Sequence, residues 1–223
     1  MNEKQLISKT IDFVKEALDG AEGGHDWFHI HRVYKNAQLI AKTEKADGLI
    51  VALGALLHDI ADSKFYPDAS GGDETIGPKM AAEFLLTLNV DSNIIEHVIH
   101  IIKNISFKSS LSNKTSTFSS KELDIIQDAD RLDAVGAIGI ARCFNYGGFK
   151  NRIIYDPEIS PNLNMTKEEY KKSKAPTINH FYEKLLLLKD KMNTKTGRRI
   201  AAERHVFMEK YLKQFFDEWN GKL

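Results

Sequence analysis

Helical periodicity runs through nearly the whole chain and limits the folds that it can adopt. Apolar residues recur at steps of three and four, first between Leu6 and Leu18 and again between Ile30 and Ala41. No alternating apolar and polar run of useful length occurs, and no internal repeat is evident. The sequence therefore predicts an all-α protein, built as a single-domain helical bundle over residues 1–223.

The most apolar segment, residues 48–60, has the sequence "GLIVALGALLHDI". Asp47 is placed to cap it as a helix, and this helix is apolar on nearly every side. A helix without a polar face is buried, so we expect it in the middle of the bundle. The run Leu49–Leu57 is far too short to span a bilayer.

The rest of the chain is expected to add further helices and two long loops. Asp91 can cap a helix, and Ser119 and Glu122 can form a capping box for one long helix over residues 122–144. Two more helices are expected at 178–192 and 197–219. The longest loops, 106–119 and 147–175, are candidates for lids or substrate loops, because long loops in compact domains are usually functional. A surface insertion without a role fits the second loop equally well.

Charge and cysteine content exclude several classes of function. Lys plus Arg (31) balances Asp plus Glu (31), so net charge gives no reason to expect binding to nucleic acid or membranes. The single cysteine, Cys143, excludes an internal disulfide framework and is expected to be a buried small hydrophobe. The N-terminal residues lack the basic and apolar regions of a signal peptide, so we expect a cytoplasmic protein.

His58 and Asp59 end the apolar helix side by side, where unpaired polar groups are costly. Taken alone, the pair is best read as a buried imidazole and a carboxylate that find partners within the protein. Two other residues change this interpretation. His29 lies near the start of another helix, and Asp130 lies amid small and apolar positions of a third. Two histidines and two carboxylates from three helices are typical of a divalent-metal site in a helical bundle.

These motifs resemble the HD-domain metal-dependent phosphohydrolases. The matching segments are "HDWFHIHRV", "ALLHDIAD" and "QDADRLDAVGAIGIAR", and "HIIKNISFK", "INHFYEKLLLLKDKMNTKTGRRIAAERH" and "FFDEW" resemble the small single-domain bacterial branch, the YpgQ/YedJ-like proteins. The likeness covers about residue 20 to the C-terminus. It implies a metal-binding core at about 20–146, with C-terminal helices at about 177–220 packing on it. The metal ligands that it implies are His29, His58, Asp59 and Asp130.

The resemblance also implies an activity. It predicts a pyrophosphohydrolase that converts (deoxy)nucleoside triphosphates to monophosphates and pyrophosphate by attack at the α-phosphorus. The alternatives are a nucleotide phosphomonoesterase, a cyclic-nucleotide phosphodiesterase, and an HD module that binds a nucleotide without turnover. Mn²⁺ is the metal expected from the resemblance, and Zn²⁺, Fe²⁺, Ni²⁺, Co²⁺ and Mg²⁺ stay open. Relatives also make a homodimer a reasonable expectation.

Several residues near the expected ligands are candidates for further roles. Asp62 resembles the acidic residue with which members of the superfamily orient or deprotonate water, and solvation of a helix end is its alternative. Lys64, Lys108 and His100 are candidates for substrate contacts, although either lysine fits a solvated surface charge as well. Arg32 shares the face of His29 on its helix and suits a phosphate contact or a salt bridge.

The remaining polar residues near the motifs are expected to support the site or to lie outside it. Asp133 is one turn from Asp130 and is expected to orient a ligand histidine. Asp26 is placed to cap the helix that carries His29. For His25, the sequence leaves open a role behind the ligands, a role at the substrate edge, and a plain surface histidine. We expect His31 to face elsewhere.

Overall fold

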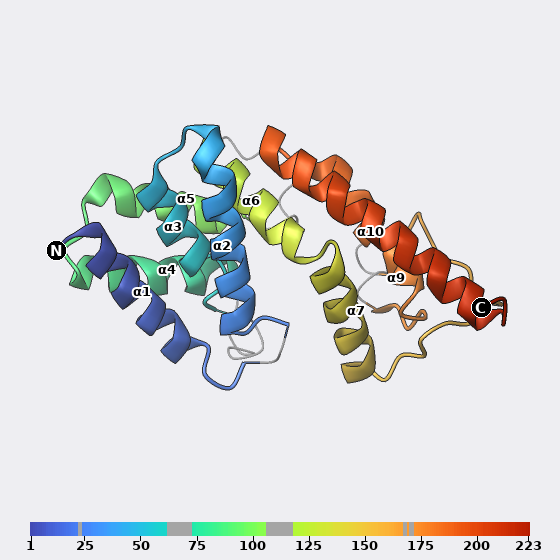
Figure 1. Cartoon of the computed structure of the whole chain (residues 1–223). Coiled ribbons are helices and arrows are strands. Elements are labelled where there is room, and N and C mark those ends of the chain that lie inside the picture. Colours follow the sequence, from blue (N-terminus) through green and yellow to red (C-terminus); the bar gives the residue numbers. More distant parts are fainter. Residues whose placement is uncertain (22–23, 62–72, 106–117, 167–168, 170–171) are drawn as a thin grey trace. The chain divides into compact units, whose positions relative to one another are not determined.

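The computed structural model describes residues 1–21, 24–61, 73–105, 118–166, 169 and 172–223, which contain helices and no strands (Figure 1). None of the described helices is long and apolar enough to cross a membrane. The predicted all-α fold is confirmed. By its contacts the chain divides into two compact units, Met1–Asp130 and Arg131–Leu223, and each is described by itself. The predicted division at 20–146 and 177–220 stays a prediction.

The first unit is built around one buried helix. Its elements are α1 (Glu3–Ala17), α2 (Trp27–Glu44), α3 (Gly48–Leu57), α4 (Asp73–Thr87), α5 (Ser92–Asn104) and most of α6 (Lys121–Asp133) (Figure 1). Helix α3 contacts α1, α2 and α5, and every residue from Ile50 to Leu57 is buried. This confirms that the helix without a polar face lies inside the bundle.

Aspartate side chains begin three helices of the first unit at the predicted places. Asp26 accepts a hydrogen bond from the backbone N–H of His29 at the start of α2, at 2.9 Å. Asp47 caps α3, and Asp91 caps α5. Each carboxylate satisfies backbone donors that the first helical turn leaves without partners. The start of α2, and with it the place of His29, is therefore fixed by a local interaction.

The predicted capping box of Ser119 and Glu122 is wrong. The hydroxyl of Ser120 caps α6 by accepting from the N–H of Leu123 at 3.1 Å. The carboxylate of Glu122 accepts instead from the N–H of Asp47 at 2.9 Å, just before α3. Because the glutamate is engaged there, it does not close the reciprocal bond that defines a capping box.

The predicted long helix over residues 122–144 is also wrong, because the chain breaks it at Gly136. Helix α6 ends at Asp133, and α7 covers Ala137–Phe149. Gly136 has a φ of +83°, which a right-handed helix does not allow and which glycine tolerates. Gly139, at the start of α7, packs so closely on the carbonyl group of Ala134 that there is no room for a Cβ atom. The small residues of this segment therefore form a tight turn between two helices.

The second unit has its own core. It contains α7, α9 (Asn179–Glu183), the 3₁₀ helix η2 (Leu185–Lys191) and α10 (Lys195–Trp219), and α10 contacts both α7 and η2. The buried cluster consists of Val135, Ile140, Cys143, Ile178, Phe181, Leu185, Leu188, Met208 and Leu212. The prediction of a helix at 197–219 agrees with α10.

The single helix predicted at 178–192 is split in the structure. Helix α9 ends at Glu183, and Lys184 adopts a φ of −144° before η2 begins. In a 3₁₀ helix, side chains three residues apart lie on one face. Leu185 and Leu188 have this spacing, and both are buried in the core of the second unit. The tighter helix therefore places both leucines in the core.

Cys143 is buried, as expected from the sequence, and its Sγ donates to the carbonyl oxygen of Thr177 at 3.7 Å. Burial raises the pKa of its thiol to about 12, although the charge of Arg152 opposes this effect. The side chain is therefore a thiol at neutral pH and behaves as a small hydrophobe rather than a nucleophile.

His180 makes the stability of the second unit depend on pH. Burial, together with the charges of Lys184 and Arg152, lowers its pKa to about 4. Because the folded-state pKa lies below the ordinary value of about 6.5, the unfolded chain takes up a proton first as the pH falls. The stabilisation is complete above pH 6.5 and is lost as the pH falls towards 4. Between pH 6.5 and 5, the wild type should lose about 2 kcal/mol more stability than His180→Gln.

Urea denaturation at several pH values between 7 and 5 checks this expectation. His31→Gln, at a histidine of α2, controls for the exchange of a histidine for glutamine outside the second unit. Equal losses of stability in the wild type and in His180→Gln would contradict it.

Candidate metal centre

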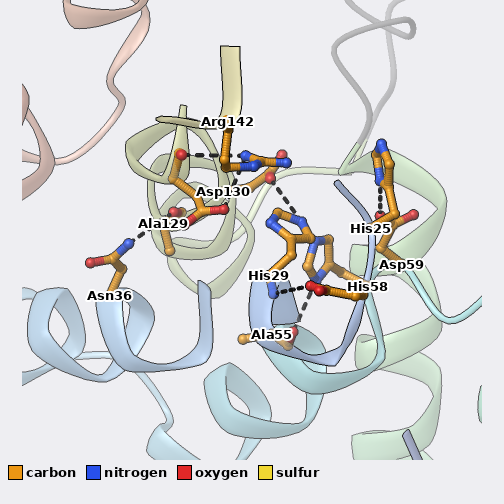
Figure 2. A network of polar contacts seen from close by, with 11 residues as sticks. His25, His29, Asn36, Ala55, His58, Asp59, Ala129, Asp130 and Arg142 are labelled. Carbon is orange, nitrogen blue, oxygen red and sulfur yellow. Dashed lines mark hydrogen bonds and ion pairs between the residues drawn. The ribbon is translucent and has the colours of Figure 1, made fainter. Parts of the chain in front are cut away.

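Three of the four predicted metal ligands converge in the first unit. The ligand atoms of His29, His58 and Asp130 all lie within 4.8 Å of one another. Figure 2 shows the two imidazole rings next to each other and near the Asp130 carboxylate, and the rings meet edge to face with their centroids 5.5 Å apart. His29 Nε2 lies 3.6 Å from Asp130 Oδ1, which is too long for a good hydrogen bond. These three side chains are therefore arranged as expected of ligands around one ion.

Helix ends place these three side chains. His29 lies in the first turn of α2, where the Asp26 cap holds its backbone N–H. His58 is the C-cap residue of α3, the most buried helix of the unit. Asp130 lies in the last turn of α6. Each ligand candidate therefore lies at the end of a separate helix, and the Asp26 cap and the burial of α3 fix the backbone at His29 and His58.

His58 provides the strongest sign that the group binds a cation. Its Nδ1 donates to the carbonyl oxygen of Ala55 at 2.9 Å, which assigns the proton to Nδ1 and leaves a lone pair on Nε2. Nε2 is buried and has no hydrogen-bond partner among the described residues. A buried acceptor without a partner costs about 1–3 kcal/mol. A metal ion bonded to Nε2 would remove this cost, so the side chain fits a ligand better than a core histidine.

The donor set and its spacing fit a divalent ion. Imidazole nitrogen and carboxylate oxygen bind first-row ions at about 2.0–2.2 Å, so ligand atoms on opposite sides of one ion are about 4 Å apart. The present spread of 4.8 Å needs only a small closure of the side chains. His29 and His58 are buried, whereas the Asp130 side chain is 41% exposed. Exposure on the carboxylate side leaves room for water or a substrate oxygen.

Asp59, the fourth predicted ligand, is not part of this group. Its Oδ2 accepts a hydrogen bond from His25 Nδ1 at 2.8 Å (Figure 2). Burial raises the pKa of Asp59, but the His25 hydrogen bond and the nearby charges of His58, His25 and His29 outweigh it and hold the pKa well below its usual range. The side chain is therefore an anionic carboxylate beside the three-residue group. Sequence reasoning left His25 undecided, and only its position next to the capping residue Asp26 hinted at a defined place.

The other predicted site residues are only partly described. Asp62, Lys64 and Lys108 lie outside the described residues, as does most of the candidate loop 106–119. Arg32 is on α2, partly buried, three residues after His29. Their proposed roles stay predictions.

His100 is involved in contacts at the surface of the first unit. Its ring stacks on Phe118 with centroids 4.9 Å apart, and its Nε2 lies 3.7 Å from Glu96. His97 contacts the hydroxyl of Ser120 at 3.0 Å. In the described part of the chain, neither histidine belongs to a group of three metal-ligating side chains.

Asp133 belongs to the second unit and is buried there. Its carboxylate forms an ion pair with Arg142 Nη1 at 3.0 Å. A buried carboxylate needs such a partner, because an unpaired charge in the interior is strongly destabilising. Its expected role in orienting a ligand histidine stays a prediction.

Comparisons with known proteins point to one family. The sequence profile of the HD domain matches residues 27–135. Bacillus subtilis YpgQ is 36% identical over 216 residues, which are 96% of this chain and 94% of YpgQ. The crystal structure of an HD-superfamily hydrolase from Bacillus thuringiensis is 42% identical, with a TM-score of 0.77 over 98% of this chain and 99% of that one. A crystal structure of YpgQ in complex with ADP aligns at 34% identity and a TM-score of 0.74, covering 98% and 97% of the two chains.

Proposed function

This chain belongs to the HD-domain family, and from that premise we propose that it is a metal-dependent hydrolase of nucleotides. The proposal rests on the convergence of His29, His58 and Asp130, and on the buried Nε2 of His58, which has no partner in the described part of the chain. The most specific form of the proposal is a pyrophosphohydrolase that converts (deoxy)nucleoside triphosphates to monophosphates and pyrophosphate.

Each candidate residue would have a separate role in such a reaction. His29, His58 and Asp130 would hold the ion, with Asp59 as the fourth ligand. A divalent ion bound there would lower the pKa of bound water and would place positive charge beside the phosphoryl oxygens. Asp62, outside the described residues, would accept the proton of the attacking water. The water oxygen bonds to the α-phosphorus, the bond from that phosphorus to the bridging oxygen breaks, and pyrophosphate leaves with this oxygen.

A nucleotide is the substrate class that the comparisons favour. YpgQ, which resembles this chain over nearly its whole length, has been crystallised with ADP. Basic side chains suit the phosphate groups of a nucleotide, and Arg32, Lys64, Lys108 and His100 are the candidates here. Mn²⁺ is the proposed ion because the family resemblance favours it. A site of two histidines and two carboxylates accepts several first-row metals, so the ion bound in the cell also depends on availability.

A hydrolysis assay with defined metals and nucleotides tests the proposal. The purified protein is stripped with a chelator, reloaded with Mn²⁺, Mg²⁺, Co²⁺, Ni²⁺ or Zn²⁺, and given each deoxynucleoside triphosphate. We expect pyrophosphate release that is absent after stripping and restored by Mn²⁺. In ¹⁸O-labelled water, attack at the α-phosphorus places the label in the monophosphate, whereas attack at the β-phosphorus places it in pyrophosphate.

Other outcomes would assign a different function. Release of inorganic phosphate from 5′-monophosphates, without cleavage of triphosphates, would indicate a phosphomonoesterase. Cleavage of cyclic nucleotides would indicate a phosphodiesterase. Nucleotide binding without any product, in protein loaded with Mn²⁺, would indicate a binding module without turnover.

A further inference from the structure

The hydrogen bond between His25 and Asp59 joins a residue without an assigned role to a predicted metal ligand. We propose that His25 is a positioning residue of the candidate metal centre. Its Nδ1–H holds Oδ2 of Asp59, and this leaves Oδ1 of the same carboxylate as the ligand atom. The inference rests on the metal centre of the proposed function and adds to it a residue that holds a ligand in place.

Local structure fixes His25 relative to the metal group. His25 directly precedes Asp26, whose side chain caps α2 through the N–H of His29. The rings of His25 and His29 meet edge to face, with centroids 5.9 Å apart. One short segment therefore carries both a candidate ligand, His29, and the histidine that holds Asp59 (Figure 2). The backbone on both sides of the cap sets the distance between them.

Asp59 has a physical need for such a partner. It follows the last turn of α3, and its side chain is 25% exposed, so water can compete for its carboxylate. A carboxylate that can turn towards solvent loses conformational freedom when it binds a metal, and this loss weakens binding. The bond from His25, at 2.8 Å, is short enough for a charge-assisted hydrogen bond and restricts the side chain before an ion arrives.

The same arrangement recurs in metal sites in general. Ligating carboxylates accept hydrogen bonds from groups behind them, and removing such a group lowers metal affinity about 10–100-fold. The Nδ1 of His58 is held in a comparable way by the carbonyl oxygen of Ala55. In this interpretation, His25 orients Asp59 as the carbonyl oxygen of Ala55 orients His58.

Metal affinity, measured without any nucleotide, tests the inference. Stripped wild-type protein and variants are titrated with Mn²⁺, and free Mn²⁺ is followed by electron paramagnetic resonance. His25→Ala should raise the dissociation constant about 10–100-fold. His25→Asn should restore affinity to within about threefold of the wild type, because the side-chain amide of asparagine can place an N–H near the position of Nδ1. His31→Asn is the matched control, since His31 packs on Trp27, and should bind as the wild type does.

Three results would overturn the inference. The first is that His25→Ala binds Mn²⁺ as tightly as the wild type, and the second is that His25→Asn binds it as weakly as His25→Ala. The third is that the wild type has no Mn²⁺ site. A merely structural role of His25 would lower the melting temperature in the presence of EDTA. We expect His25→Ala to stay within about 2 °C of the wild type there, because one partly buried hydrogen bond contributes little to stability. If the wild type binds Mn²⁺ with the expected pattern of variants but hydrolyses no nucleotide, the proposed function is wrong and the role of His25 stands.

Discussion

Replacing His58 with alanine is expected to lower Mn²⁺ affinity at least about 100-fold and nucleotide hydrolysis about 1,000-fold. The buried Nε2 of this residue has no partner among the described residues, so the substitution removes a side chain that is available as a metal ligand. A bound ion contributes several kcal/mol to a phosphoryl-transfer transition state, and each 1.4 kcal/mol is about tenfold in rate. Metal content after dialysis and pyrophosphate release at saturating Mn²⁺ measure the two effects.

The unfolding transition separates this prediction from a structural role of His58. The substitution loses the Nδ1 bond to Ala55, but it also removes the penalty of a buried Nε2 that has no partner among the described residues. Because these two effects offset each other in part, we expect a small loss of stability in EDTA. A core histidine would give the opposite pattern, with a large fall in melting temperature and unchanged metal content. His31→Ala, on the neighbouring helix α2, serves as the control and should keep both metal and activity.

The second large effect is expected in the second unit, at Gly139. An alanine Cβ atom at this position would lie well under 3 Å from both the carbonyl oxygen and the carbonyl carbon of Ala134. Backbone atoms in a tight turn cannot move aside cheaply, so Gly139→Ala should lower the free energy of unfolding by about 3 kcal/mol or more. Urea denaturation followed by circular dichroism measures the change.

Gly148 provides a matched control in the same helix. A Cβ atom at this position would meet nothing within 4 Å, and its φ is not in the left-handed region. Gly148→Ala should therefore raise stability by about 0.5 kcal/mol, because alanine loses less backbone entropy than glycine when a helix forms. Equal effects of the two substitutions would show that the turn at Ala134 yields more easily than its geometry implies.

Local features of this fold could be predicted because neighbouring residues determine them. Aspartates directly before apolar periodic segments predicted the caps of α2, α3 and α5, which depend on contacts two or three residues apart. The apolar character of α3 predicted its burial for the same reason. The ligand candidates His29, His58 and Asp130 were suggested by their residue types on three helices and assigned by the resemblance to the HD-domain family, and the structure brings them together.

Other features escaped sequence reasoning because they depend on distant contacts. The turn at Gly136 looked like part of a helix, since glycine and alanine also occur where helices pack closely. The split at Lys184 depends on how Leu185 and Leu188 enter the core of the second unit. The bond between His25 and Asp59 spans 34 positions in the sequence, and no local pattern indicates it.

The burial of α3 has a consequence for how the candidate centre would respond to heat. Loops and chain ends open by small local fluctuations, whereas a helix surrounded by others opens only when most of its unit does. His58 ends such a helix, whose residues Ile50 to Leu57 are all buried. The backbone that carries His58 should therefore keep its place up to the temperature at which most of the first unit melts. The protein would then keep this part of the centre ready to bind an ion until the fold itself is lost.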